Sequence, residues 1–535
     1  MNQSCHGATP SPVTGALIVN EWLASTHNTN NGAGCADCHE PDAGHPNLCN
    51  KCHGGGGFGV TVNPDQAGKC GKCHGLNHPQ DVMVRLSPAH FGNQTTSYLS
   101  NNYRASYVSS NYAGNCRKCH NPHDTSTASQ VAHDWAGSGH GNVTKARTNA
   151  DFKTRGTYQP VSTTFQYFCV RCHTTTGFVN FAKSGFQVQA PFAGPGYPVV
   201  QNAPVTVAPG ASQPADTPSL DKTKEVTGCD ACHDDGKGNA YGYQVRKVGA
   251  AVIYYNFSSS NSSPTVKLNN KPVSYPDVGD SNVCVPCHTG RGIGSMIYDA
   301  QNAGMDFKNT NSPGAHDRAT GLTLFQKGGY EFAGLNYSNP IFQHSKVGLA
   351  NFNGTGNHGP CVACHMTGTN THTFSPVSFD STGAVNAIIS TACNWCHNGV
   401  TSPTISIATY NAKKTGYQSA LAILNALRTG KTATLANRNT NYEALYAGGG
   451  ANTMGAAFNY SMLNNETGAF AHNPLYAKRL IWDSIDWLYN GAIDNDVVAA
   501  INSVPLSTKI TAATKTSAIN WLTTAEDGTP ITGRP

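Results

Sequence analysis

Cysteine and histidine carry the chemistry that this sequence offers. Eighteen of its 19 Cys fall in nine Cys-x-x-Cys pairs, and every pair is followed directly by His. Two thiols at this spacing reach two vinyl groups on one edge of a porphyrin, and the next residue places its imidazole under the iron as proximal ligand. The spacing therefore predicts nine covalently attached haem c groups. The predicted thioether residues are Cys35, Cys38, Cys49, Cys52, Cys70, Cys73, Cys116, Cys119, Cys169, Cys172, Cys229, Cys232, Cys284, Cys287, Cys361, Cys364, Cys393 and Cys396, and the predicted proximal ligands are His39, His53, His74, His120, His173, His233, His288, His365 and His397.

Other uses of paired cysteines fit this pattern less well. Disulfides do not require a His after each pair. Structural zinc would join the pairs into sites of four ligands, and nine is an odd number of pairs. A thioredoxin-like redox pair occurs once, near a βαβ pattern. The repetition therefore favours a multihaem c-type cytochrome.

The nineteenth Cys, Cys5, is followed by His6, but Asn2 stands where a normal motif has its first thiol. Three interpretations stay open. The sequence could be trimmed at its start, with the first Cys of a longer-spaced motif lying upstream. Haem could instead be attached to Cys5 through a single thioether bond, or Cys5 could be an ordinary free thiol. Cys5 and His6 are therefore tentative attachment and proximal residues, and the count is nine haems or ten.

The 22 His are numerous enough to give every iron a second ligand. Nine are proximal by motif and His6 is a tentative tenth, which leaves twelve for nine or ten irons. Met ligation would raise the potentials, but only Met366 of the seven Met adjoins a motif, and it cannot reach the far face of its own haem. We therefore expect low-spin, low-potential haems with two His ligands each. The candidate distal ligands are His27, His45, His78, His90, His123, His140, His316, His344, His372 and His472; His133 and His358 complete the twelve.

Three of these candidates lie very close to a proximal ligand in the sequence. His123 follows His120 by three residues, His78 follows His74 by four, and His45 follows His39 by six. So short a link cannot wrap round to the far face of the same haem, but it can reach a neighbouring one. We expect such segments to clamp two haems side by side.

The remaining composition excludes several partners. The net charge is +5 over 535 residues with no basic run, so nucleic-acid binding has no support. The longest apolar runs, such as residues 249–255, are too short to span a bilayer. Residues 1–23 lack the basic and apolar parts of a signal peptide. Because haem is attached to such motifs outside the cytoplasm, we expect a mature or trimmed form of an exported protein.

Motif density divides the chain into three expected regions. Residues 1–130 form a dense haem region, residues 131–400 a sparser one with a β insertion near 241–275, and residues 401–535 a haem-free helical region. The Gly- and Asn-rich start cannot bury a normal side-chain core. The expected fold is therefore mostly irregular chain with short helices wrapped around a chain of haems, plus the small β insertion and the helical C-terminal region.

Helix signals are clearest in the last region. Residues 417–427 have apolar side chains at helical spacing, and Gly430 is expected to end that helix. Asn473 and Pro474 are expected to begin a second helix, which Gly491 ends. Short helices are expected near 497 and 519–522. His472 precedes the second helix, either as a surface residue or as a distal ligand reaching back to the main body or to a neighbouring subunit.

Short blocks spread over most of the chain carry a family resemblance. They are Glu21-Trp22-x-x-Ser25-x-His27, Trp135-x-x-Ser138-Gly139-His140-Gly141, the motif segments 169–177, 284–291 and 359–366, and Gly468-Ala-Phe-Ala-His472-Asn473. These blocks resemble segments of the large multihaem cytochromes on the outer surface of dissimilatory metal-reducing bacteria. The resemblance implies an extracellular or outer-surface location and electron transfer to other cytochromes and extracellular acceptors. Some such cytochromes polymerise into filaments.

Electron conduction without a bound substrate is the leading functional hypothesis, which makes the protein a carrier and not an enzyme. The alternative is a multihaem reductase of a small molecule such as nitrite or a sulfur oxyanion, which needs an iron with an open position. A periplasmic carrier or the cytochrome of an outer-membrane conduit is a third class. If subunits stack into a filament, His27, His372 or His472 could cross the junction.

Overall fold

The computed structural model describes the second half of the chain almost completely and the first half in short pieces. The described residues are 7–10, 16–25 and 28, short pieces between 95 and 233, and residues 244–535 except 260–261, 339–341, 368–370, 401–403 and 432–438. The predicted dense haem region, residues 1–130, therefore lies almost wholly outside the described residues. Residues 187–222 also lie outside the described residues.

The chain divides into two compact units. The first comprises Met1–Ser184, Gln189–Lys247 and Thr369–Ser375, and the second comprises Gly185–Val188, Val248–Gly368 and Pro376–Pro535. The C-terminal helices therefore belong to the same unit as the attachment motifs at Cys284, Cys361 and Cys393.

The first unit holds short elements in its described parts. They are α2 (Ile18–Ala24), β1 (Thr95–Thr96), β2 (Tyr103–Ala105), β3 (Thr223–Lys224), α12 (Cys229–Cys232) and η7 (Thr371–Thr373). Strand β2 pairs antiparallel with β1 and parallel with β3. Thr227 joins two segments, since its carbonyl accepts from the indole N–H of Trp135 at 3.1 Å and its hydroxyl donates to the carbonyl of Cys172 at 2.9 Å.

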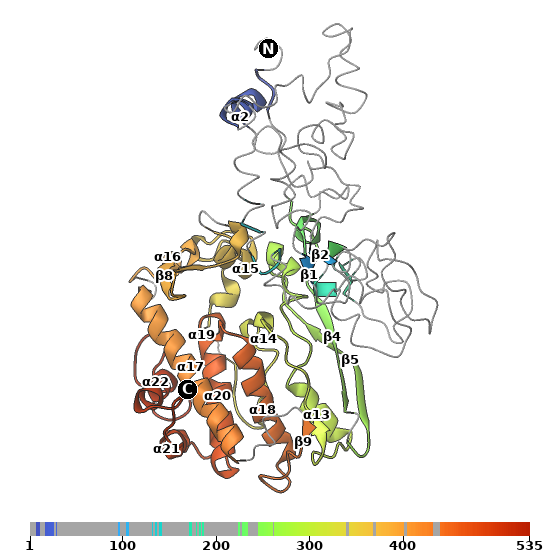
Figure 1. Cartoon of the computed structure of the whole chain (residues 1–535), viewed down its shortest axis with the longest axis vertical. Helices are drawn as coiled ribbons and strands as arrows, with labels where there is room; N and C mark the ends of the chain where they lie inside the picture. Colours follow the sequence, from blue (N-terminus) through green and yellow to red (C-terminus); the bar gives the residue numbers. More distant parts are fainter. Residues whose placement is uncertain are drawn as a thin grey trace, which may run out of the picture. The chain divides into compact units, whose positions relative to one another are not determined.

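An antiparallel hairpin opens the second unit (Figure 1). Strands β4 (Val252–Ser259) and β5 (Val266–Ser274) lie where β-branched and aromatic residues predict short strands. Ile253, Tyr255 and Phe257 alternate into the interior. The hydroxyl of Tyr255 donates to the carbonyl of Thr289 at 2.8 Å, which ties the hairpin to the motif that ends at His288.

The attachment motifs of the second unit lie on or beside short helices. These elements are η4 (Gly279–Val283), α14 (Thr320–Leu324), η5 (His344–Lys346), η6 (Phe352–Gly354), α15 (Gly359–His365) and α16 (Thr391–Cys396). In α15, Cys361 and Cys364 are three residues apart and so share one helix face. The small pairs β6 (Thr310–Asn311) with β9 (Asn439–Thr440) and β7 (Val377–Phe379) with β8 (Val385–Ile388) complete this part, together with helix α13 (Ser295–Asn302).

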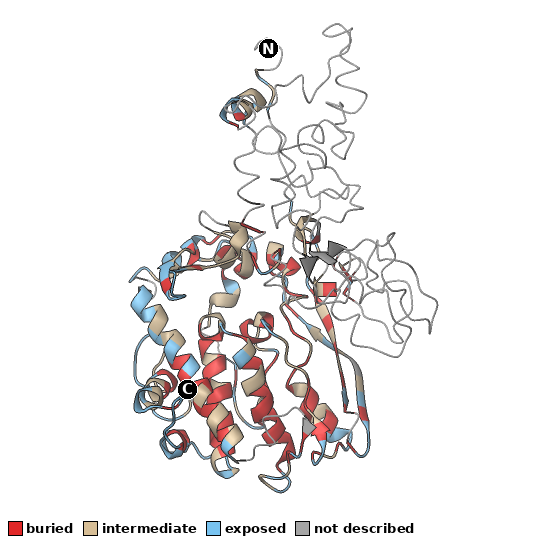
Figure 2. Ribbon diagram, in the orientation of Figure 1, coloured by how far each residue is buried: buried red, intermediate tan, exposed pale blue. Residues whose placement is uncertain are grey.

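Longer helices form the core of the second unit. They are α17 (Ile407–Lys431), α18 (Gly450–Asn465), α19 (Ala469–His472), α20 (Pro474–Asn490), α21 (Val497–Ser503) and α22 (Ala512–Leu522). Helices α17, α18 and α20 pack on one another, and Figure 2 shows buried residues concentrated on α18 and α20. On α18, Gly455 has no side chain to obstruct Tyr330, since a Cβ there would lie 2.0 Å from that ring.

The predicted ends of the C-terminal helices are partly right. Asn473 caps α20 by accepting from the N–H of Tyr476 at 3.1 Å, and Gly491 ends it with a φ of 82°. Helices α21 and α22 lie where short helices are predicted. The expectation that Gly430 ends the first helix is wrong, because α17 continues to Lys431. A single Gly in a helix costs only about 1 kcal/mol, which the packing of α17 can offset.

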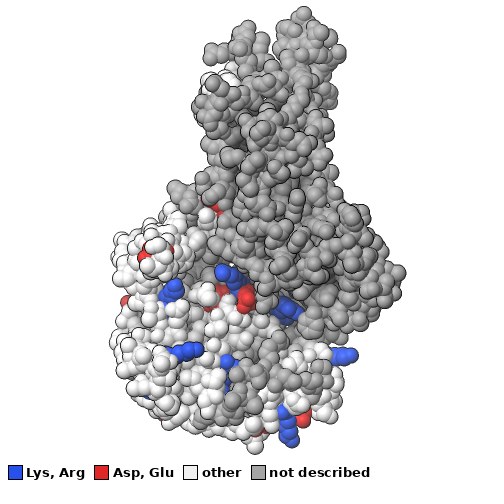
Figure 3. Space-filling model, in the orientation of Figure 1, with Lys and Arg blue, Asp and Glu red and all other residues white. Residues whose placement is uncertain are grey.

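None of the helices in the described part of the chain has a stretch long and apolar enough to cross a lipid bilayer. On the face shown in Figure 3, the described residues carry few charged side chains. This agrees with a composition in which 12% of residues are charged.

Candidate haem-binding sites

Nine of the predicted thioether cysteines lie in the described residues. They are Cys172, Cys229, Cys232, Cys284, Cys287, Cys361, Cys364, Cys393 and Cys396, and none of them is in a disulfide. Burial, together with neighbouring thiols, raises the pKa of the Cys232 thiol to about 11 and that of the Cys364 thiol to about 12.

Three predicted proximal ligands each face a predicted distal ligand. The ring centres of His233 and His372 are 6.2 Å apart with planes at 27°. Those of His344 and His397 are 6.2 Å apart at 76°. Those of His365 and His472 are 6.0 Å apart at 33°. Each pair joins residues that are distant in sequence but lie in the same compact unit.

This separation leaves room for one metal ion between the rings of each pair. A metal–imidazole bond is about 2 Å long and the ring centre lies about 1 Å beyond the nitrogen, so two rings on opposite faces of one iron have centres roughly 6 Å apart. Direct stacking of two rings would bring the centres closer, to about 4.5 Å in the tightest arrangements. The observed pairs therefore fit two axial ligands of a haem iron.

The partners of the other ring nitrogen support this fit. Nδ1 of His288 lies 3.0 Å from the carbonyl of Arg318, and Nδ1 of His344 lies 2.6 Å from that of Ala471. Because a carbonyl oxygen only accepts, Nδ1 carries the proton in both rings and Nε2 keeps its lone pair for a metal. Nδ1 of His316 likewise lies 2.9 Å from a carbonyl, that of the next residue.

His472 has a different kind of partner. Its Nδ1 lies 2.6 Å from Oε1 of Glu466, a carboxyl group that is almost fully buried. The sequence gives no sign of this contact, because neither the residue type nor the spacing marks Glu466 as part of a haem site.

The three attachment motifs of the second unit lie beside one another. Ser281, just before Cys284, donates its hydroxyl to the carbonyl of His358 at 2.8 Å and accepts from the N–H of Val362 at 3.0 Å. These bonds join the Cys284 motif to the start of α15.

The motif on α15 in turn contacts the last one. Ala363 and Cys364 of α15 pack with Ala392 of α16 and with Val347. The side-chain amide of Asn353 donates to Sγ of Cys396 at 3.5 Å. The order in space is therefore Cys284, Cys361 and Cys393.

Two more predicted distal ligands, His140 and His316, lie in the described residues. His140 lies edge-on to Phe374, with ring centres 4.7 Å apart, and His372 lies 5.9 Å from the same ring. His316 is near the Cys284 motif, since its Cβ would lie 3.9 Å from a Cβ built on Gly290. His358, outside the ten candidates, pairs with Asp280 at 2.6 Å.

Of the remaining predicted site residues, only His173 lies in the described residues. Those outside them are Cys5, Cys35, Cys38, Cys49, Cys52, Cys70, Cys73, Cys116, Cys119, Cys169, His6, His27, His39, His45, His53, His74, His78, His90, His120 and His123. His133, which is not among the ten distal candidates, also lies outside the described residues. The side-by-side clamps predicted for His45, His78 and His123 belong to this group and stay predictions.

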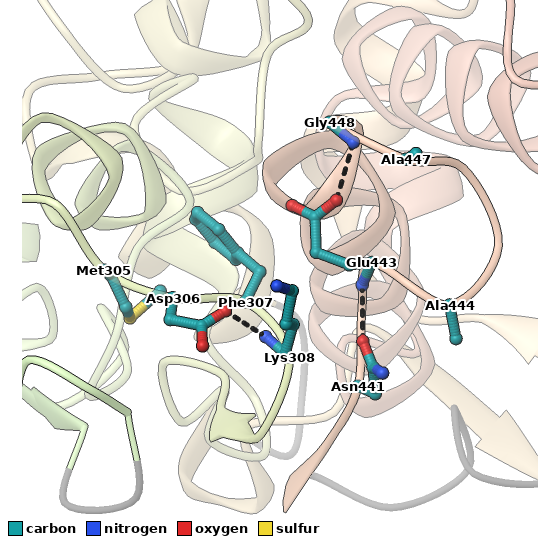
Figure 4. A pocket seen from close by; sticks show the side chains of 9 residues that line it. All are labelled: Met305, Asp306, Phe307, Lys308, Asn441, Glu443, Ala444, Ala447 and Gly448. Carbon is teal, nitrogen blue, oxygen red and sulfur yellow. Dashed lines mark hydrogen bonds between the residues drawn. The ribbon is translucent and has the colours of Figure 1, made fainter.

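A surface hollow of about 550 Å³ lies away from the histidine pairs, between residues 305–308 and 441–448 (Figure 4). Its lining holds Asp306, Lys308 and Glu443 but neither Cys nor His. Glu443 accepts from the N–H of Gly448 at 2.7 Å, so its carboxylate is used to fix the chain before α18. The hollow therefore supplies neither attachment cysteines nor histidine ligands for a haem.

Comparison with known proteins finds long matches to cytochromes. The chain is 33% identical over 548 residues to the C-type polyheme cytochrome OmcB of two Geobacter sulfurreducens strains, covering 89% of this chain and 70% of the relative. It is 36% identical over 381 residues to the C-type polyheme cytochrome OmcC of the same species, covering 66% of this chain and 47% of the relative. No family model matches the chain. No solved structure matches it either.

Proposed function

Because the chain belongs to the family of C-type polyheme cytochromes, we propose that it conducts electrons through neighbouring haems that are each held between two histidines. Membership of the family makes haem c its cofactor and electron transfer its role, as a carrier and not an enzyme. The resemblance to outer-surface cytochromes of metal-reducing bacteria is thereby confirmed at the level of the family. The ligand sets, the haem count and the location are parts of the proposal.

The chain's own residues would hold three haems in the described part as follows. Cys229 and Cys232 would attach one between His233 and His372. Cys361 and Cys364 would attach a second between His365 and His472, and Cys393 and Cys396 a third between His397 and His344. When bound, each haem supplies a one-electron iron(III)/iron(II) couple.

The single observation that carries this proposal is the set of three histidine pairs with ring centres 6.0–6.2 Å apart. Two imidazoles on opposite faces would fill both axial positions and leave none for nitrite or a sulfur oxyanion. The pairs therefore favour a carrier over the reductase alternative.

One short helix fixes ligands of two neighbouring sites. Helix α19 provides His472 itself, and the carbonyl of the preceding residue, Ala471, accepts from His344 at 2.6 Å. The C-terminal helices thus reach back to the haem-binding part of the chain. This supports the sharper of the two predictions for His472, that it is a distal ligand and not a surface residue.

The wider proposal concerns the whole protein. We expect nine haems, or ten if Cys5 and His6 hold one, wrapped by irregular chain and short helices. We place the protein outside the cytoplasm, extracellular or on the outer cell surface, with other cytochromes and extracellular acceptors as partners. Self-association into a filament stays part of the proposal. The pairing of His372 and His472 within one chain favours His27 as the residue to test at a junction.

The experiment that tests the carrier function is a spin count on the oxidised full-length holoprotein. Electron paramagnetic resonance should show every iron low-spin, and addition of nitrite or sulfite should leave the spectrum unchanged. A high-spin signal worth one iron or more that changes with either anion would support the reductase alternative instead.

A further inference from the structure

Glu466, which follows helix α18, is held so that its carboxyl group faces His472. The side chain is 2% exposed. Oε1 lies 2.6 Å from Nδ1 of His472, and Oε2 accepts from the hydroxyl of Thr320 at 2.7 Å. Its backbone carbonyl accepts from the hydroxyl of Tyr417 at 2.9 Å, and its N–H donates to Leu463 at 3.0 Å. A carboxylate held through both oxygens and its backbone has a fixed position beside the imidazole.

The turn between Glu466 and α19 is shaped for this contact. A Cβ at Gly468 would lie 2.5 Å from Cε1 of His472 and 3.3 Å from Oε1 of Glu466. Only a glycine leaves both side chains where they are. The contact between the carboxylate and the ring therefore requires a residue without a side chain at position 468.

A carboxylate acts on a metal-bound imidazole more strongly than a carbonyl does. His288 and His344 have carbonyl partners at Nδ1, whereas His472 has a charged one. A negative acceptor draws the Nδ1 proton away from the ring and makes Nε2 a stronger electron donor to its metal. Stronger donation stabilises iron(III) over iron(II). A fixed negative charge in a buried position adds to this effect.

We propose that Glu466 lowers the reduction potential of the haem attached at Cys361 and Cys364, acting through its hydrogen bond to His472. Glu466 is then a tuning residue that touches the ligand and not the iron. The inference rests on the proposed function, since it requires His472 to be an axial ligand. This haem then gives up its electron more readily than it would if His472 had an uncharged partner.

The first test replaces Glu466 by Gln in the full-length holoprotein. Gln keeps an oxygen that accepts from Nδ1 of His472 but removes the charge. His472→Ala identifies the resonance of this haem, because the low-spin component that disappears belongs to it. In E466Q that component should persist and be reduced at higher potential, with its reduction equilibrium constant raised about tenfold, which corresponds to about 59 mV for one electron.

A second variant shifts the same potential in the opposite direction. Thr320→Val keeps the shape of the side chain but removes the hydroxyl that donates to Oε2. A carboxylate that no longer accepts a hydrogen bond from Thr320 is a stronger acceptor for the Nδ1 proton of His472. The reduction potential of the haem attached at Cys361 and Cys364 should therefore fall. Disturbed packing alone would not produce shifts of opposite sign in E466Q and T320V. If E466Q does not accumulate as holoprotein, T320V alone decides, and an unchanged potential overturns the proposal.

Glu443→Gln is the matched control. It removes a carboxylate at the opposite end of α18, which has 16 residues and so is about 24 Å long. Its titration should superimpose on that of the unaltered protein. If E466Q superimposes as well, the tuning role is refuted while the ligand assignment stands. If His472→Ala leaves every iron low-spin, the ligand assignment itself fails, and with it the proposed function at this site.

Discussion

Replacing His344 by Ala should leave one identifiable iron without its sixth ligand. His344 faces His397 at 6.2 Å, and its Nδ1 bond to Ala471 holds the ring in place. The two thioethers from Cys393 and Cys396 should keep the haem attached. The variant should therefore retain its full haem content while one iron becomes high-spin.

The size and shape of the lost signal follow from the sequence and the structure. One iron in nine or ten is affected, so the low-spin intensity should fall by roughly a tenth. The planes of His344 and His397 are 76° apart. Nearly perpendicular imidazoles give a highly anisotropic low-spin signal, whereas nearly parallel ones give a rhombic signal. The difference spectrum should thus be of the anisotropic kind, and that of His472→Ala, whose planes are 33° apart, of the rhombic kind.

The assay is electron paramagnetic resonance of the oxidised holoprotein, with haem content measured separately. Lys346→Ala is a suitable control, because it alters an exposed side chain in the same turn, η5, without touching the ring pair. The reasoning is refuted if His344→Ala keeps its full low-spin intensity, or if its difference spectrum is rhombic like that of His472→Ala.

Three further outcomes are expected. The mass of the holoprotein should exceed that of the chain by nine or ten haems, and eight or fewer would contradict the motif count. Asn459→Ala should weaken the packing of α18 by about 2–6 kcal/mol, because the N–H and carbonyl of Tyr330 both lose their buried partner; hydrogen exchange in α18 at the rate of the unaltered protein would show this to be wrong. Burial raises the pKa of Glu526, but the charges and hydrogen bonds of Lys478 and Lys413 outweigh burial and hold that pKa below its ordinary value. The ion pairs of Glu526 with the two lysines therefore stabilise the fold at pH values above the ordinary pKa of a Glu carboxyl. This stabilisation is lost as the pH falls through the lowered pKa. Thermal melting should therefore shift downward in acid, and less so in Glu526→Gln.

Local signals in the sequence predict local structure well. Asn473, Pro474 and Gly491 each act within a few residues of a helix end, and the helix they predict is observed as α20. Helix α18 was not predicted, because Met454, Phe458 and small residues are buried around most of its circumference. A helix buried on nearly all sides lacks the polar face that makes the period visible.

The same difference between local and long-range signals applies to the candidate haem sites. Attachment cysteines and proximal ligands can be identified from spacing alone, because the thiols and the imidazole act on one haem from one short segment. The pairing of His233 with His372, or of His365 with His472, depends on how distant segments meet, which the sequence does not encode locally. Glu466 could not be found at all, since one Glu six residues before a His is an ordinary occurrence.

An experimental structure of the haem-loaded protein tests the central claim most directly. The measured quantity is the distance from each iron to the Nε2 atoms of its two histidines. The account predicts one iron, about 2 Å from both nitrogens, between His233 and His372, between His344 and His397, and between His365 and His472. An iron at any of these attachment motifs with an open sixth position, or with a different residue in it, would contradict the account.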